Sequence, residues 1–361
     1  MFEAAATLRS ILHPLKVGTG MHRATPIRLI FAFAFAGASG LLAAPAGTTS
    51  PRDLTDSGFE HFYNLEYDQA IADFRQVVQQ QPDSAEAWNH LSQGLFYAAL
   101  FDGGLMGSDL IKSNDALLKT PKLVVAPARE SEFLASLQKA MTLSEARLKT
   151  SPKDSEAAYQ LGVSYALQAN YSFLVKHSWL AGLKQANMSR TLHEQVLRSD
   201  PRNIDANLIP GTHEYMIGTL PAIVRLVARA AGLNGNRTKG LETVEKVAAK
   251  GERTRVDAQI LVCVLYRREN RSRDGIPVML RLREEYPRNF LYRIELAKFY
   301  TDLGRREDAR AELRKLQELM DKQAPGYSGS RVPVIHRAAS GIEKLLVDAP
   351  ASPVAAITHP N

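Results

Sequence analysis

The feature that most constrains this 361-residue chain is a pattern that recurs with a period of 34 residues. The full pattern places a small residue between an apolar and an aromatic residue in one helix and a proline after the next helix, and pieces of it recur along the chain. Gly58 and Ser92 occupy the small position of two copies and lie 34 residues apart, as do Cys263 and Ala297. Repetition at this period predicts stacked helical hairpins, each of which packs on its neighbours.

A third copy, Leu161, Gly162 and Tyr165, follows the Leu-Gly-x2-Tyr consensus most closely, and a weaker copy lies between Pro201 and Gly211. A small residue lets two helices approach to about 8–10 Å, while a proline ends the second helix. In these positions the sequence resembles the tetratricopeptide-repeat (TPR) family over most of residues 53–325. The resemblance implies an all-α fold: an α-solenoid of about five TPR-like helical hairpins with irregular insertions and a C-terminal capping helix.

The spacing between copies predicts how the chain is divided. Gly162 to Gly211 spans 49 residues and Gly211 to Cys263 spans 52, both longer than the period, and residues 100–130 are first Gly-rich and then apolar. We expect TPR-like repeats in 53–99, 131–211 and 252–325, an insertion loop at 100–130, an extended helical segment at 212–251, a capping helix within 326–348 and a disordered tail at 349–361.

Residues 213–251 carry a second resemblance. Leu220-Pro221, the turn from Gly232 to Arg237 (GLNGNR) and Gly240-Leu241 occur in the order seen in the central region of the eukaryotic inclusion-body-clearance family. That family implies a helical scaffold that handles proteins or lipids near a membrane, without catalytic residues that could be assigned here. The match covers about forty residues, and the amino terminus departs from the family's pattern.

The amino terminus has the order of a secretory signal peptide. A basic region that includes Arg23 and Arg28 precedes the apolar run 29–43, and small residues at 44–46 suit cleavage after Ala46. Residues 1–20 are a candidate for an over-extended start, since Met21 would begin a shorter signal. An uncleaved anchor and an organelle presequence are the alternatives. We expect an exported protein, periplasmic or extracellular, associated with the cell envelope in the anchored case.

Without residues 1–46 the chain has a net charge of +4, distributed unevenly. Residues 223–331 hold 24 Lys and Arg against 15 Asp and Glu, a net charge of +9, and the rest of the mature chain carries −5. The densest cluster runs from Arg267 to Arg273. It suits a solvated helix end or a contact with an anionic partner. No aromatic residues interleave with it, which disfavours nucleic acid as a partner.

No pattern predicts catalysis or a bound cofactor. The chain lacks a nucleophile elbow, a phosphate-binding loop and a dinucleotide fingerprint. His193-Glu194 and His213-Glu214 have no second histidine at zinc-helix spacing, so we interpret them as polar residues on helix surfaces and predict no metal site. The single cysteine, Cys263, occupies a packing position and is interpreted as a buried, inert thiol.

The concave face of a helical solenoid is the expected partner surface. Alignment of the repeats assigns to it the residues Asn89, Gln93, Phe96, Tyr159, Arg267, Arg268, Ile294 and Lys298. Arg225 and Arg229, four residues apart in an apolar stretch, share one helix face and are candidates for contact with an anionic membrane; the alternative is a buried repeat helix whose arginines reach the surface.

Three functions remain open from the sequence. The leading one is a non-catalytic, exported scaffold that binds a protein or peptide on its concave face. The second is a membrane-associated factor that handles lipids or proteins. The third is an enzyme with its site in the 100–130 insertion.

Overall fold

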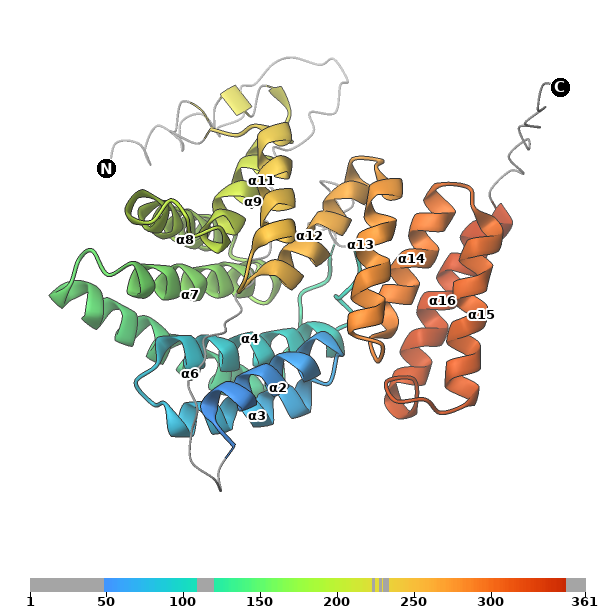
Figure 1. The fold of residues 1–361 in the computed structure, drawn as a ribbon, viewed down its shortest axis with the longest axis horizontal. Helices are drawn as coiled ribbons and strands as arrows, with labels where there is room; N and C mark the ends of the chain where they lie inside the picture. Colours follow the sequence, from blue (N-terminus) through green and yellow to red (C-terminus); the bar gives the residue numbers. More distant parts are fainter. Residues whose placement is uncertain (1–48, 109–119, 223–224, 227–228, 230–233, 349–361) are drawn as a thin grey trace, which may run out of the picture.

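The computed structural model describes residues 49–108, 120–222, 225, 226, 229 and 234–348. The expected signal peptide and the expected disordered tail therefore lie outside the described residues. Within them the regular elements are all helices, which confirms the all-α prediction (Figure 1).

Successive α-helices pack as antiparallel pairs. The first three hairpins are α2 (Pro51–Tyr63) with α3 (Tyr67–Gln80), α4 (Ala85–Asp102) with α6 (Pro127–Thr150), and α7 (Ser155–Leu174) with α8 (Trp179–Ser199). The next three are α9 (Leu208–Gly218) with α11 (Arg237–Lys250), α12 (Arg255–Arg268) with α13 (Ser272–Glu285), and α14 (Phe290–Asp302) with α15 (Arg306–Asp321). The last helix, α16 (Val332–Asp348), packs on α14 and α15 and caps this end of the stack.

The first hairpin shows why the repeat pattern folds in this way. Ser50 caps α2, since the backbone N–H of Asp53 donates to its hydroxyl over 3.1 Å, and Pro51 suits the first turn. A Cβ atom at Gly58 would lie 2.4 Å from the ring of Phe74, so only glycine permits this approach of α2 and α3. Trp88 Nε1 donates to the carbonyl of Pro82 over 2.8 Å, which ties the next hairpin to this one.

The expected insertion separates the two helices of the second hairpin. Helix α4 continues to Asp102, and residues Gly103–Ser108, which we call the strap, then cross from α4 towards α12 and α14. Gly104 has a φ of +70°, a conformation that suits glycine, at the turn where the strap leaves α4. Residues 109–119 of the insertion lie outside the described residues, and α6 begins at Pro127.

Residues 212–251, expected as an extended helical segment, instead contain most of the α9/α11 hairpin. The cause is a close backbone crossing. A Cβ atom at Gly240 would lie 2.3 Å from the backbone nitrogen of Tyr215, and one at Gly218 would lie 2.2 Å from the nitrogen of Arg237. Glycine at these positions lets the two helices pack backbone to backbone.

The solenoid closes on itself. The turn between α2 and α3 lies beside α13 and α14, at the bottom centre of Figure 1. The side chain of Asn64 accepts from the backbone N–H of Arg288 over 3.0 Å, and Asn289 Nδ2 donates to the carbonyl of Tyr63 over 2.7 Å. The Arg288 guanidinium pairs with Glu66 over 2.9 Å. Hydrogen bonds and an ion pair therefore join the turn of the first hairpin to the turn between α13 and α14.

Candidate functional site

The predicted concave residues of α4 are buried. The amide nitrogen of Asn89 donates to the carbonyl of Gln160 over 2.9 Å, and its oxygen accepts from Ser164 over 2.7 Å, so this side chain holds α4 against α7. Gln93 is also buried, and Phe96 packs on Phe133 with ring centres 5.6 Å apart. These three residues pack helices together, and a partner cannot reach them without opening the fold.

Tyr159 is buried as well, beneath Arg253 and against His193, whose ring centre lies 5.1 Å away. This corrects the interpretation of His193 as a surface residue. Its ring packs against the glycine face of α7 at Gly162, where a Cβ atom would lie 2.5 Å from Cε1. Burial lowers the pKa of His193 to about 4, so the imidazole is neutral at physiological pH.

Arg267 is the predicted partner residue whose surroundings differ most from expectation. Its side chain is only 4% exposed, and its Nε donates to Asp302 over 2.7 Å. Its Nη1 donates to the hydroxyl of Ser108 over 2.6 Å, and that hydroxyl donates in turn to Glu295. Arg267 therefore anchors the strap to α12 and α14, and its charge is balanced inside the protein.

The remaining predicted partner residues are divided between surface and interior. Ile294 is buried, but it lines the surface groove described below together with Lys298. Lys298 is half-buried and its Nζ pairs with Glu295 over 2.8 Å. Arg268 is half-buried beside the ring of Tyr215. The structure thus brings Arg267, Ile294 and Lys298 together and leaves Arg268 on another side of α12.

An open groove of about 590 Å³ lies between the end of α4, the strap, α14 and α16. Its walls are mainly apolar, and Arg337 on α16 is an exposed cation at its edge. Leu345, 55% exposed, continues the apolar wall towards solvent. The lining residues are Phe101, Gly104, Leu105, Met106, Gly107, Thr120, Pro121, Arg267, Phe290, Leu291, Ile294, Lys298, Val334, Arg337, Ala338, Gly341, Ile342 and Leu345.

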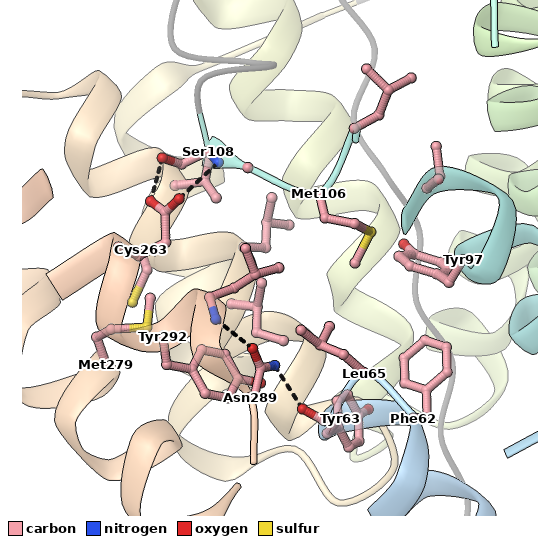
Figure 2. Close-up of a pocket in the computed structure, with 18 of the residues that line it drawn as sticks. Phe62, Tyr63, Leu65, Tyr97, Met106, Ser108, Cys263, Met279, Asn289 and Tyr292 are labelled. Atoms are coloured by element: carbon pink, nitrogen blue, oxygen red, sulfur yellow. Dashed lines mark hydrogen bonds between the residues drawn. The ribbon is translucent and has the colours of Figure 1, made fainter. Parts of the chain in front are cut away.

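A separate cavity of about 130 Å³ lies on the other side of the strap, where the first hairpin meets α12, α13 and α14 (Figure 2). Aromatic rings from the first hairpin, α4 and α14 line it, and Met106 of the strap reaches over it. Cys263 also lines it, and burial raises the pKa of this thiol. The burial expected for Cys263 is confirmed, since its side chain is almost inaccessible to solvent.

The described residues hold no group of three or more His, Cys, Asp or Glu side chains that could bind a metal ion. Across the same part of the chain, no helix combines the length and the apolar character needed to cross a membrane. Arg225 and Arg229 are exposed and helical, and Arg225 Nη1 donates to the carbonyl of Gly218 over 3.0 Å. Between them Leu226 is 67% exposed.

Sequence reasoning missed both compartments because neither follows from the repeat. The groove depends on α16, for which the sequence predicted only a cap, although Val334, Ala338, Ile342 and Leu345 recur there at helical spacing. This apolar stripe is longer than a helix that only caps the repeats needs, and it was the signal in the sequence that could have predicted the groove. The cavity depends on the closure of the solenoid, and no local pattern indicates it.

A comparison with protein families supports one copy of the repeat. Residues 58–96, from Gly58 through α3 into α4, match the tetratricopeptide repeat family. Among solved structures, a thermophilic TPR protein of Thermus thermophilus is similar at 13% identity and a TM-score of 0.38, covering 69% of this chain and 98% of that one. The human IFIT1 dimer with m7Gppp-AAAA is similar at 13% identity and a TM-score of 0.32, covering 82% of this chain and 60% of that one. No curated protein matches the chain. None of these comparisons bears on the inclusion-body-clearance resemblance, which stays a prediction.

Proposed function

We propose that this chain, which carries a tetratricopeptide repeat at residues 58–96, is an exported, non-catalytic scaffold that binds a protein partner in the α14/α16 groove. The groove is the observation that carries the proposal. It is open, apolar and edged by a cation, whereas the predicted concave residues of α4 are buried. Export rests on the signal-like sequence of residues 22–46 alone.

The chemistry of the groove specifies the kind of partner. An apolar wall formed by Val334, Ala338 and Leu345 favours an apolar peptide segment, which gains free energy when it leaves water. Arg337 at the edge favours an acidic side chain within that segment, since opposite charges steer association and set the register. The partner we propose is therefore a protein with an exposed apolar segment that contains an acidic residue.

Affinity capture from the protein's own cell envelope tests this proposal. The parent protein and two variants serve as baits. The groove variant carries Arg337→Glu and Leu345→Glu, at two exposed positions of the groove. The matched control carries Arg198→Glu and Leu180→Glu, exposed residues of the same types on α8. We expect the parent and the control to capture the same partner in equal amount. The groove variant should capture at least tenfold less of it, since a loss of about 1.4 kcal/mol of binding free energy lowers the affinity tenfold. Equal capture by the groove variant would overturn the assignment. Amino-terminal sequencing of the exported protein should begin near residue 47.

A second function, contact with an anionic membrane, is favoured by one observation. Exposed Leu226 lies between exposed Arg225 and Arg229 in a helical segment, an arrangement suited to the surface of a bilayer with anionic lipids. Co-sedimentation with phosphatidylserine vesicles, lost on Arg225→Glu and Arg229→Glu, would support it. Equal sedimentation of parent and variant would contradict it.

A further inference from the structure

Helix α16 presents a regular face to the groove. Its lining residues are spaced by three or four positions or adjoin one another, and form one stripe: Val334, Arg337, Ala338, Gly341, Ile342 and Leu345. They make two overlapping sets with the spacing i, i+3, i+4 and i+7, the first beginning at Val334 and the second at Ala338. In coiled coils, four residues of one helix surround a hole that receives one side chain of the facing helix. This face of α16 therefore has the spacing of a surface that receives another helix.

Gly341 belongs to both sets and leaves the middle of this face open. It is exposed, and a Cβ atom added there would meet no other part of the protein within 4 Å. Ala338, the other residue common to both sets, has only a methyl side chain. A bulky side chain of a docked helix can therefore lie over Gly341 without displacing anything.

The polar groups of the groove favour a helix over an extended segment. The backbone N–H groups of a buried extended segment need acceptors, and a buried N–H without one costs free energy. Among the described lining residues, the hydroxyl of Thr120 is the only side-chain oxygen, and the charged side chains are Lys or Arg, which cannot accept. The strap offers backbone carbonyls, but pairing along one edge satisfies only alternate residues of a strand. A helix satisfies its backbone internally except at its ends.

The length and charge of the groove set two further requirements. Leu345 follows Val334 by 11 residues, which at a rise of about 1.5 Å per residue is about 16 Å, or three helical turns. Two of the lining cations are balanced within the protein, Arg267 by Asp302 and Lys298 by Glu295. Arg337 is exposed and has no ion pair among the described residues. It is complementary to an acidic side chain at the margin of a docked helix.

We propose that the segment which binds in this groove is an amphipathic α-helix of about three turns, supplied by another protein. Its apolar residues recur at i, i+3 or i+4, and i+7. One bulky side chain lies over Gly341, and an acidic residue beside the apolar stripe pairs with Arg337. The inference rests on the proposed function, because it takes the groove as the partner site, and it adds the conformation of the bound segment, which capture alone does not report.

Two displayed libraries of peptides about sixteen residues long identify the form that binds. In the first, a framework of Ala, Glu and Lys keeps the peptide helical and one face is randomised. In the second, the randomised positions lie between prolines at every fourth residue, which prevent a helix. Both are selected on the full mature chain, and a groove binder is a clone whose affinity falls at least tenfold on Arg337→Glu with Leu345→Glu. We expect groove binders from the helical library, with the apolar spacing and the acidic residue given above.

Gly341→Leu tests how the helix packs. The added side chain fills the space that a bulky residue of the docked helix would occupy, so the affinity for helical groove binders should fall at least tenfold. The midpoint of thermal unfolding should not fall, because leucine favours a helix more than glycine and nothing obstructs it. Ser340→Leu is the matched control, since Ser340 is exposed beside Gly341 and does not line the groove. It should leave the affinity unchanged within about twofold.

The outcomes separate this inference from the proposed function. Groove binders that come only from the proline library would overturn the helix while leaving the groove as the partner site. Helical groove binders that bind Gly341→Leu as tightly as the parent would overturn it too, and so would a failure of both libraries to yield groove binders. Equal capture of the partner by parent and groove variant is a different result, because it removes the groove itself as the site.

Discussion

The hydroxyl of Tyr63 donates a hydrogen bond to Oδ1 of Asp257 over 2.9 Å, although 194 positions separate the two residues in the chain. Both are buried, and Oδ2 of Asp257 has no hydrogen-bond partner within the described structure. Burial raises the pKa of Asp257 well above its usual range, and the nearby charge of Asp205 raises it further, while the bond from Tyr63 opposes the shift. One hydrogen bond thus joins the first hairpin to the fifth at the cost of a desolvated carboxyl group.

Asp257→Asn should therefore stabilise the protein at neutral pH. In the parent the folded-state pKa lies above the unfolded value of about 3.9, so the contribution of Asp257 to stability is present at low pH and is lost as pH rises through the folded pKa. The amide keeps the acceptor for Tyr63 and cannot ionise. Urea unfolding from pH 4 to pH 8 measures the free energy of unfolding of both proteins, and the excess stability of Asp257→Asn over the parent should grow with pH. An advantage that shrinks with pH would contradict the explanation.

For His90 we expect the opposite dependence of stability on pH to that of Asp257. Burial, aided by the charge of Arg253, lowers its pKa to about 3, and its Nδ1 has no hydrogen-bond partner within the described residues. Because the unfolded histidine titrates near 6.5, the folded state loses stability as pH falls below that value, by about 2 kcal/mol at pH 5. In His90→Leu the ring nitrogens are absent. The difference between the free energies of unfolding at pH 7.5 and pH 5 should therefore be smaller by about 2 kcal/mol than in the parent. An unchanged difference would refute the assignment.

Arg267→Ala should reduce stability by about 3–5 kcal/mol, because it removes the buried cation that pairs with Asp302 over 2.7 Å and lies 3.9 Å from Glu295. Arg273→Ala is the control, since Arg273 is exposed in the same basic cluster, and it should change stability by less than about 0.5 kcal/mol. Guanidinium unfolding measures both. Similar losses of stability for the two variants would show that the buried network around Arg267 contributes no more to stability than an exposed arginine does.

Gly162→Ala should destabilise the protein by about 1–3 kcal/mol, because the added methyl group overlaps the ring of His193. The same substitution in a His193→Ala background should cost little, as the ring is then absent. A double-mutant cycle of thermal unfolding measures the difference, which is the coupling between the two residues. A coupling near zero would mean that His193 does not limit the space at Gly162.

The repeat chemistry was predictable from sequence because it is local. A small residue such as Gly58 or Gly162 must stand where two helices touch, and the buried thiol of Cys263 followed from the same register. These rules act within about 34 residues, so one chain shows them several times. The predicted alternation of helices and the all-α class rest on this periodicity.

Closure of the solenoid was not predictable in the same way. It depends on Asn64, Arg288 and Arg331, polar residues in turns that the repeat does not prescribe, and on pairings more than 200 positions apart. The concave residues were misplaced as well: Asn89 and Gln93 of α4 are buried, and Asn89 is hydrogen-bonded to α7. A repeat pattern specifies which helices are neighbours and leaves open how far the superhelix curls.

The strap has one further consequence. Leu105, Met106 and Gly107 form part of the wall of the groove and of the cavity, so a guest behind the strap and a peptide in front of it touch the same three residues from opposite sides. If one guest changes the affinity of the other, thermodynamic linkage requires the same factor in both directions. A small molecule that raises the affinity for a protein partner would then itself bind more tightly to the complex than to the protein alone, and the shared wall would couple the two sites.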